Sequence, residues 1–180
     1  IRHMKAFGYC GQMYPIHPSA GEIEGLKAFA SMADLPSIVD YAYVAVAAPR
    51  VPDVIRSLAG RVRIAQVMSS GFGETAAGHD LEQEVARAAR DAGVRVIGPN
   101  CLGVYSPRGR MTFTERTLAE PGVVGIVCQS GGLGIDIIRR GQNRGLRFSG
   151  LVTVGNCADV RPSELLEYFL ESPDTSVVGL

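Results

Sequence analysis

Two segments of the chain contain residues whose types and spacing could bind a ligand. The first is Ile97-Gly98-Pro99-Asn100-Cys101-Leu102-Gly103, whose glycines allow unusual backbone angles and whose asparagine offers a side-chain amide. Such a loop at the carboxyl end of a parallel strand lies where open α/β sheets bind ligands. Taken alone, the segment is equally consistent with a tight connection between two elements that binds no ligand.

The second segment is Gln129-Ser130-Gly131-Gly132-Leu133-Gly134, which follows the apolar run 123–128. A strand, a Ser/Gly turn and a helix start bring free N–H groups and the positive end of a helix dipole together, which favours phosphate or a carboxylate. The segment is neither a Walker loop nor a complete GxGxxG motif. A plain turn in which Ser130 caps the helix is therefore the alternative interpretation.

No side chain in the sequence is predicted to be catalytic or to bind a metal. The three histidines lie far apart and in no metal or triad motif, so surface or structural roles are expected for His3, His17 and His79. The four cysteines form no CxxC pair and fit the reduced thiols of a cytosolic protein; they are Cys10, Cys101, Cys128 and Cys157. Cys101 is interpreted as a buried packing residue rather than a nucleophile. Asp159 is assigned to a helix cap and Glu167 to a solvated face.

The pattern of apolar residues predicts alternating strands and helices around these segments. Strands are expected at 43–47, 63–68, 94–97, 123–128, 148–154 and 176–180. Helices are expected at 51–58, 80–92, 131–140 and 162–170. Near the amino terminus the sequence favours the end of a helix over 1–9, a strand running into a loop over 11–18, and a short helix over 26–32. The alternation is typical of α/β proteins with parallel sheets and right-handed crossovers.

Three of the predicted strands end in loops of small residues. These loops are Ala48-Pro49, Ser69-Ser70-Gly71 and Gly98-Pro99-Asn100. Because the carboxyl ends of parallel strands lie along one rim, the three loops are expected to line a common crevice that binds a ligand. Residues 104–121 are expected to form an irregular linker to a second domain.

The composition excludes several classes of protein. Of the 180 residues, 46% are apolar and 20% are charged, and the formal net charge is zero, so neither disorder nor a basic nucleic-acid-binding surface is expected. The apolar runs are too short to span a membrane, and no secretory signal opens the chain. Because both ends interrupt predicted elements, we expect an internal fragment of a longer polypeptide.

Six motifs occur in an order that resembles a known family. They are Tyr14-Pro15-Ile16-His17-Pro18, Asp34-Leu35-Pro36, Ser69-Ser70-Gly71-Phe72-Gly73-Glu74, Gly98-Pro99-Asn100-Cys101-Leu102-Gly103, Cys128-Gln129-Ser130-Gly131-Gly132-Leu133-Gly134 and Gly155-Asn156-Cys157-Ala158-Asp159. The chain resembles, over its whole length, the nucleoside-diphosphate-forming acyl-CoA synthetase superfamily. That superfamily includes ADP-forming acetyl-CoA synthetases and the succinyl-CoA synthetase α subunit.

The resemblance implies an α/β fold with two domains. A Rossmann-like parallel-sheet CoA-binding domain would occupy 1–115, with its first strand and glycine-rich loop before Ile1. The start of a flavodoxin-like ligase domain, similar to succinyl-CoA synthetase, would occupy 122–180. Relatives often place a lysine near the CoA phosphates where this chain has Ser19-Ala20.

The resemblance also implies which residues contact ligands. CoA or acyl-CoA would be held by Pro18, Ala48, Pro49, Ser70, Gly71, Asn100 and Cys101. Phosphate would be held by Gln129, Ser130 and Gly131. A bulky residue at Gly131 is then expected to impair phosphate binding and to leave CoA binding, in the other domain, almost unchanged.

The implied activity is that of an acid–thiol ligase. It would reversibly convert acyl-CoA, ADP and phosphate into a carboxylic acid, CoA and ATP through acyl phosphate and a phosphohistidine that follows Leu180. ATP or ADP with Mg²⁺ would bind an ATP-grasp portion, which is either fused to this chain or part of a β subunit. The whole enzyme would be oligomeric and cytoplasmic, and the fragment alone would be inactive. The alternative is a catalytically inactive CoA-sensing domain, as in synthetase-like regions fused to lysine acetyltransferases. An NAD(P)-binding dehydrogenase domain rests on fold analogy alone.

Overall fold

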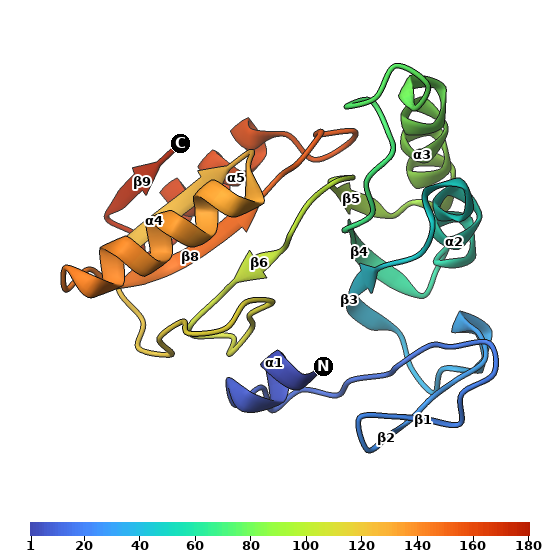
Figure 1. The fold of residues 1–180 in the computed structure, drawn as a ribbon, viewed down its shortest axis with the longest axis horizontal. Coiled ribbons are helices and arrows are strands. Elements are labelled where there is room, and N and C mark those ends of the chain that lie inside the picture. The colour runs from blue at the N-terminus through green and yellow to red at the C-terminus, as the bar shows by residue number, and fades with distance from the viewer.

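Two sheets, each bordered by helices, organise the chain (Figure 1). The structure is a computed structural model that describes residues 1–180. The first sheet is parallel throughout and has the order β3 (Val39–Val44), β4 (Val62–Val67), β5 (Arg95–Ile97). The second has the order β6 (Val104–Tyr105), β8 (Phe148–Thr153), β7 (Val124–Cys128), β9 (Val177–Gly179). Within these two sheets only β6 is antiparallel to its neighbour, so the predicted α/β class is confirmed.

Helices cover one face of the first sheet; they are α2 (Val51–Ser57) and α3 (His79–Ala92). Because side chains alternate along a strand, Ala65 and Val67 of β4 point into the core beneath these helices. Ile55 of α2 and Val85 of α3 belong to the same core and are fully buried. Gln66, between the two core residues of β4, points to the opposite face, and this position matters for the site described below.

The second sheet is covered on both faces by helices; they are α4 (Gly131–Asn143) and α5 (Pro162–Glu171). Consecutive residues of β8 pack in different clusters. Leu151 packs in the same cluster as Ile138 of α4, whereas Val152 packs in the same cluster as Phe169 of α5. The near-continuous apolar sequences of β7 and β8 follow from this two-sided burial.

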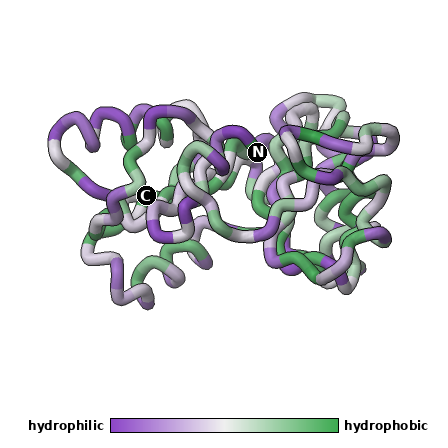
Figure 2. The backbone as a smooth tube through the Cα atoms, turned by 90° about the horizontal axis from the view of Figure 1, so that it is seen from below, coloured by the Kyte–Doolittle hydropathy of each residue, from purple (hydrophilic) through white to green (hydrophobic).

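The two sheets meet where β5 ends. Ile97 and Cys101 belong to the same buried cluster as Val127, Val152 and Val154 of the second sheet and its following loop. Figure 2 shows hydrophobic stretches in both halves of the molecule and hydrophilic stretches at the outer turns. The loop after β5 is therefore packed against the second sheet.

The amino-terminal segment differs most from the sequence-based expectation. Helix α1 (Arg2–Ala6) falls within the helical end predicted at 1–9. The strand predicted within 11–18 is wrong, because this segment forms only one isolated bridge, between Ile16 and Phe29. The two prolines of the segment cannot donate ladder hydrogen bonds, which limits regular pairing.

The short helix predicted over 26–32 is also wrong. A hairpin occupies its start, formed by β1 (Glu22–Ile23) and β2 (Leu26–Lys27). Glu24 and Gly25 adopt φ values of 54° and 73°, the left-handed angles that two-residue hairpin turns favour. The turn geometry therefore overrides the helix-forming composition, and only a single 3₁₀ turn, η1 (Met32–Asp34), follows.

Residues 104–121 are not wholly the irregular linker that was predicted. Strand β6 pairs with β8, with Val104 opposite Val152 and Tyr105 opposite Leu151. Two residues of the range 1–115 therefore belong to the second sheet, and the division into 1–115 and 122–180 stays a prediction.

The other predicted elements are confirmed, and their ends agree within three residues except at β3. The strand predicted at 43–47 lies earlier, at Val39–Val44, because the end of the apolar run leaves the sheet and leads into η2 (Ala48–Arg50). None of the helices is long and apolar enough to cross a membrane.

Candidate functional site

The three loops at the carboxyl ends of β3, β4 and β5, here called the rim loops, lie together as predicted. Asn100 N–H donates to Ser69 O at 2.9 Å, and Ser69 Oγ donates to Val46 O. A Cβ atom added at Gly71 would lie 3.5 Å from Ala48 Cβ. The side chains of Pro49, Ser70 and Asn100 are exposed, so the rim is open to a ligand.

Pro18 is not joined to the rim loops by any hydrogen bond. It is exposed, and its neighbours bond locally, since His17 Nδ1 accepts from Ser19 N–H at 3.3 Å and from Ala20 N–H at 3.0 Å. The structure therefore brings together the other predicted CoA-contacting residues of the rim, whereas no hydrogen bond ties Pro18 to them. All of these binding roles stay predictions.

Cys101 packs beneath the rim and has no accessible thiol. It is 2% exposed, and its Sγ donates to Thr153 O at 2.6 Å. Burial raises the pKa of the Cys101 thiol to about 11, so it is neutral near pH 7. Thr153 Oγ1 also accepts from Gly103 N–H at 2.9 Å, which fixes the end of the loop on β8. The interpretation of Cys101 as a packing residue is confirmed.

Gln66 braces the same loop from the first sheet, and the sequence analysis missed it. This side chain is fully buried, donates to Cys101 O at 3.2 Å and accepts from the Tyr41 hydroxyl. Burial raises the pKa of Tyr41 well above its usual value, which keeps the phenol a donor. The ring of Tyr43 stacks on Phe113 with centroids 4.4 Å apart. The available signal was a glutamine between two apolar residues of the strand, Ala65 and Val67.

The Gln129–Gly131 turn opens α4. Ser130 Oγ accepts from Leu133 N–H at 3.3 Å, so the predicted helix cap is present. No hydrogen bond within the chain engages the N–H groups of Gly131 or Gly132. Free N–H groups at a helix start favour an anion, so the Ser130 cap leaves these donors available, and the phosphate-binding role of the turn stays a prediction.

A segment after β8, residues 155–160, connects this turn to the rim and is here called the linking segment. Gly155 N–H donates to Gln129 O at 3.2 Å, Asn156 N–H to Pro99 O at 3.0 Å, and Ala158 N–H to Gly98 O at 2.9 Å. Gly155 has φ +55°, and a Cβ atom there would lie 2.2 Å from Pro99 O. Only glycine permits this close backbone approach.

The predicted phosphate turn and the rim loop after β5 are therefore neighbours, and their assignment to two separate domains stays a prediction. A Cβ atom added at Gly131 would lie 2.6 Å from Leu102 Cβ, two residues after Asn100. Substitution at Gly131 must consequently disturb the rim loop as well as the turn. The sequence could not show this, because the contact joins segments with no local relation.

Asn156 and its partners form a second group that the sequence analysis did not assign. Its Nδ2 donates to Glu74 at 2.6 Å and to Glu82 at 2.7 Å. Asp159, predicted as a helix cap, instead accepts from Val96 N–H at 2.7 Å and so holds the linking segment against β5. The only sequence signal was a Gly-Asn pair at the end of β8, which repeats the pattern of the rim.

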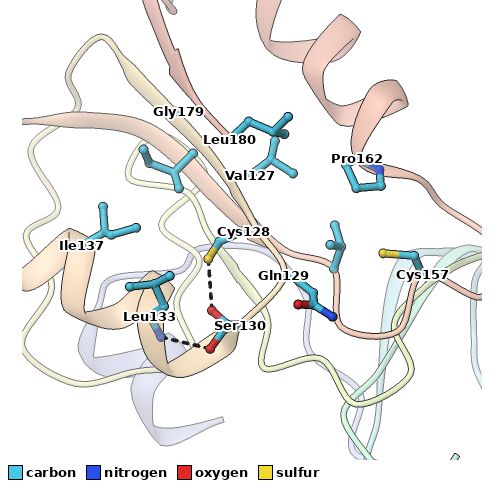
Figure 3. A pocket seen from close by; sticks show the side chains of 12 residues that line it. Val127, Cys128, Gln129, Ser130, Leu133, Ile137, Cys157, Pro162, Gly179 and Leu180 are labelled. Atoms are coloured by element: carbon cyan, nitrogen blue, oxygen red, sulfur yellow. Dashed lines mark hydrogen bonds between the residues drawn. The ribbon is translucent and has the colours of Figure 1, made fainter. Parts of the chain in front are cut away.

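A cavity of about 480 Å³ lies beside the Gln129–Gly131 turn, at the carboxyl ends of β7 and β9. Eight of its twelve lining residues are hydrophobic. Figure 3 shows Cys128, Gln129, Ser130 and Cys157 around it, with Cys128 Sγ donating to Ser130 O at 3.3 Å. The four cysteines are free thiols, and no group of residues is arranged to hold a metal ion.

Known proteins resemble this chain in sequence. Residues 1–107 match the family of CoA binding domains, and residues 121–180 match the succinyl-CoA ligase-like flavodoxin domain. The chain is 34% identical to the α subunit of ADP-forming acetate–CoA ligase I from Pyrococcus furiosus, over 99% of the chain and 40% of that subunit. It is also 34% identical to ADP-forming acetate–CoA ligase II from Archaeoglobus fulgidus, over 100% of the chain and 28% of that protein.

A solved structure agrees with these sequence relatives. Dinucleotide-forming acetyl-coenzyme A synthetase 1 of Candidatus Korarchaeum cryptofilum, in complex with phosphate and ADP, has a TM-score of 0.90 and 35% identity to this chain. The match covers 98% of this chain and 38% of that chain, so the chain spans well under half of the relatives' length. The chain therefore belongs to the CoA-binding domain family and, with its succinyl-CoA ligase-like region, to the nucleoside-diphosphate-forming acyl-CoA synthetase superfamily.

Proposed function

We propose that the full-length protein is an ADP-forming acyl-CoA synthetase, which reversibly converts acyl-CoA, ADP and phosphate into a carboxylic acid, CoA and ATP. The observation that carries the proposal is the linking segment, because Gly155 bonds to Gln129 while Asn156 bonds to Pro99. An anion-binding turn beside an open rim is what joint phosphate and thioester chemistry requires. The names of the relatives as ADP-forming acetate–CoA ligases support the same reaction class.

Different residues suit the phosphate and the CoA in this reaction. The N–H groups of Gly131 and Gly132, with the dipole of α4, suit a phosphoryl group that must approach the backbone closely. The exposed Ser70 and the amide of Asn100 suit the polar parts of CoA, whose thiol takes the acyl group. Cys101 stays protonated and buried, so it offers no competing nucleophile.

We infer that the remaining parts of the reaction lie outside the 180 residues. In the direction of ATP formation, phosphate would displace CoA from the thioester to give acyl phosphate, whose phosphoryl group would pass to a histidine after Leu180, releasing the acid, and then to ADP. ATP or ADP with Mg²⁺ would bind an ATP-grasp portion, fused or in a partner subunit. His79 fits this division, because it lies on α3 and its ring is engaged locally, with Nε2 3.0 Å from Gln83 Nε2.

The test is an assay of the full-length protein with ATP, Mg²⁺, CoA and a set of carboxylic acids. The set includes acetate, 4-hydroxybutyrate and trans-ferulate, the acids that appear in the names of relatives. Thioester formation with at least one acid is expected, and Asn100→Ala should weaken CoA binding while the exposed Asn143→Ala should not. No thioester and no histidine-linked phosphate with any acid would contradict the proposal. CoA binding without either product would favour a CoA-sensing domain.

A further inference from the structure

Asn156 lies between two glutamates from the region of the first sheet. Its Nδ2 lies 2.6 Å from Glu74 Oε2 and 2.7 Å from Glu82 Oε2. Its Oδ1 lies 3.5 Å from Asn100 Nδ2, and its backbone N–H donates to Pro99 O at 3.0 Å. One residue of the linking segment therefore contacts two rim loops and the start of α3.

The two carboxylates that this amide joins hold the backbone of a rim loop. Glu74 accepts from the N–H groups of Gly71 and Phe72, and Glu82 accepts from Gly73 N–H at 2.9 Å. Three consecutive N–H groups of the loop thus depend on two carboxylates. Their like charges would repel each other without a donor between them.

Only a neutral amide suits the position of Asn156. A carboxamide has two N–H donors, one for each carboxylate, whereas an aspartate would bring a third negative charge and no donor. Burial raises the pKa of the Glu74 carboxyl, but hydrogen bonds from Gly71 and Asn156 outweigh burial and lower the pKa below its usual value. The Glu74 carboxylate is therefore a charged partner for the amide near pH 7.

We propose that Asn156 is a positioning residue for CoA binding, which fixes the Gly71–Gly73 backbone beside Asn100 by bridging Glu74 and Glu82. The inference rests on the proposed function, because that function assigns the rim loops to CoA. Gly155, which precedes the bridge, bonds to Gln129 O at 3.2 Å, so the bridge also ties the rim to the phosphate turn.

The test compares three variants of the full-length protein with the wild type. Asn156→Asp places a carboxylate against Glu74 and Glu82. The double variant Asn156→Asp/Glu82→Gln restores one amide–carboxylate pair, in which position 82 now donates and position 156 accepts. Gln83→Glu is the matched control, since it adds the same charge on the exposed side of α3. The measurements are amide hydrogen exchange over 70–74 without ligand and the Kd of CoA by calorimetry.

We expect Asn156→Asp to accelerate exchange at Gly71–Gly73 and to weaken CoA binding about tenfold, the size of one charge-assisted hydrogen bond. The double variant should recover most of both losses, and Gln83→Glu should match the wild type. Unchanged exchange, or faster exchange with unchanged CoA affinity, would overturn the inference, as would a double variant no better than Asn156→Asp. If the wild type bound no CoA, the proposed function would fail, and the exchange comparison would still decide whether the bridge exists.

Discussion

The first sheet and the second sheet position their candidate binding groups by different means. In the first, strand side chains hold the loop, since Gln66 donates to Cys101 O and accepts from Tyr41. In the second, the Gln129–Gly131 turn presents backbone N–H groups at the start of α4. We therefore expect the first region to be most sensitive to substitution of strand side chains, and the second to glycine substitutions that add a Cβ atom. The linking segment, which contacts both regions, is the exception.

The largest effect is expected at the junction itself. Gly155→Val places a Cβ atom 2.2 Å from Pro99 O at a φ of +55°, so the two regions must separate. We expect roughly 3–5 kcal/mol of lost stability, as for other severe backbone clashes, and loss of both CoA and phosphate binding. Urea unfolding of the full-length protein measures the first quantity.

The control for this prediction is Gly145→Ala. Gly145 also has a positive φ, of +85°, but a Cβ atom there meets nothing within 4 Å. Only the backbone strain of about 1–2 kcal/mol is therefore expected. Equal losses for the two variants would show that the junction is not tightly packed.

A buried glutamine should matter more for CoA binding in the first region than in the second. Gln66→Leu leaves Cys101 O and the Tyr41 hydroxyl without their buried partner, which should cost roughly 2–3 kcal/mol and weaken CoA binding. Gln142→Leu is the counterpart, because Gln142 is also buried and donates to Tyr105 Oη at 3.0 Å. It should lower stability while CoA affinity stays unchanged, and a similar loss of CoA affinity in both would remove the distinction.

Alkaline pH should weaken the contact between the regions through Cys101. Its pKa rises from 9.0 in an exposed thiol to about 11 in the folded protein. The stabilisation by the neutral thiol is therefore present below pH 9 and is lost as the pH rises toward 11, by roughly 2–3 kcal/mol at most. Unfolding free energies of the wild type and Cys101→Ala across this range measure it, and parallel curves would contradict the assignment.

The sequence allowed the alternation of strands and helices to be predicted because apolar periodicity is local. The grouping of Ala48-Pro49, Ser69-Gly71 and Gly98-Asn100 on one rim followed from the geometry of a parallel sheet alone. The hairpin at Glu24-Gly25 was missed because this pair is not among the strong turn signals, Asn-Gly and Asp-Gly.

Contacts between distant segments lay beyond sequence reasoning. Nothing local to Asn156 indicates Glu74 and Glu82, which are 82 and 74 residues away. Likewise, Gln66 reads as an ordinary strand residue until the fold places Cys101 O beside it. The two candidate sites are joined by the linking segment, which packs on Pro99, and by Leu102, which lies beside Gly131.

The most direct test of this joint site compares Gly131→Ala with Gly132→Ala in the full-length protein. A Cβ atom at Gly131 would lie 2.6 Å from Leu102 Cβ, whereas at Gly132 the nearest atom is 4.0 Å away. The measurement is the Kd of CoA for each variant. We predict about tenfold weaker CoA binding for Gly131→Ala, equivalent to roughly 1.4 kcal/mol, and no change for Gly132→Ala. Wild-type CoA affinity in Gly131→Ala would contradict the claim that the turn and the rim form one site.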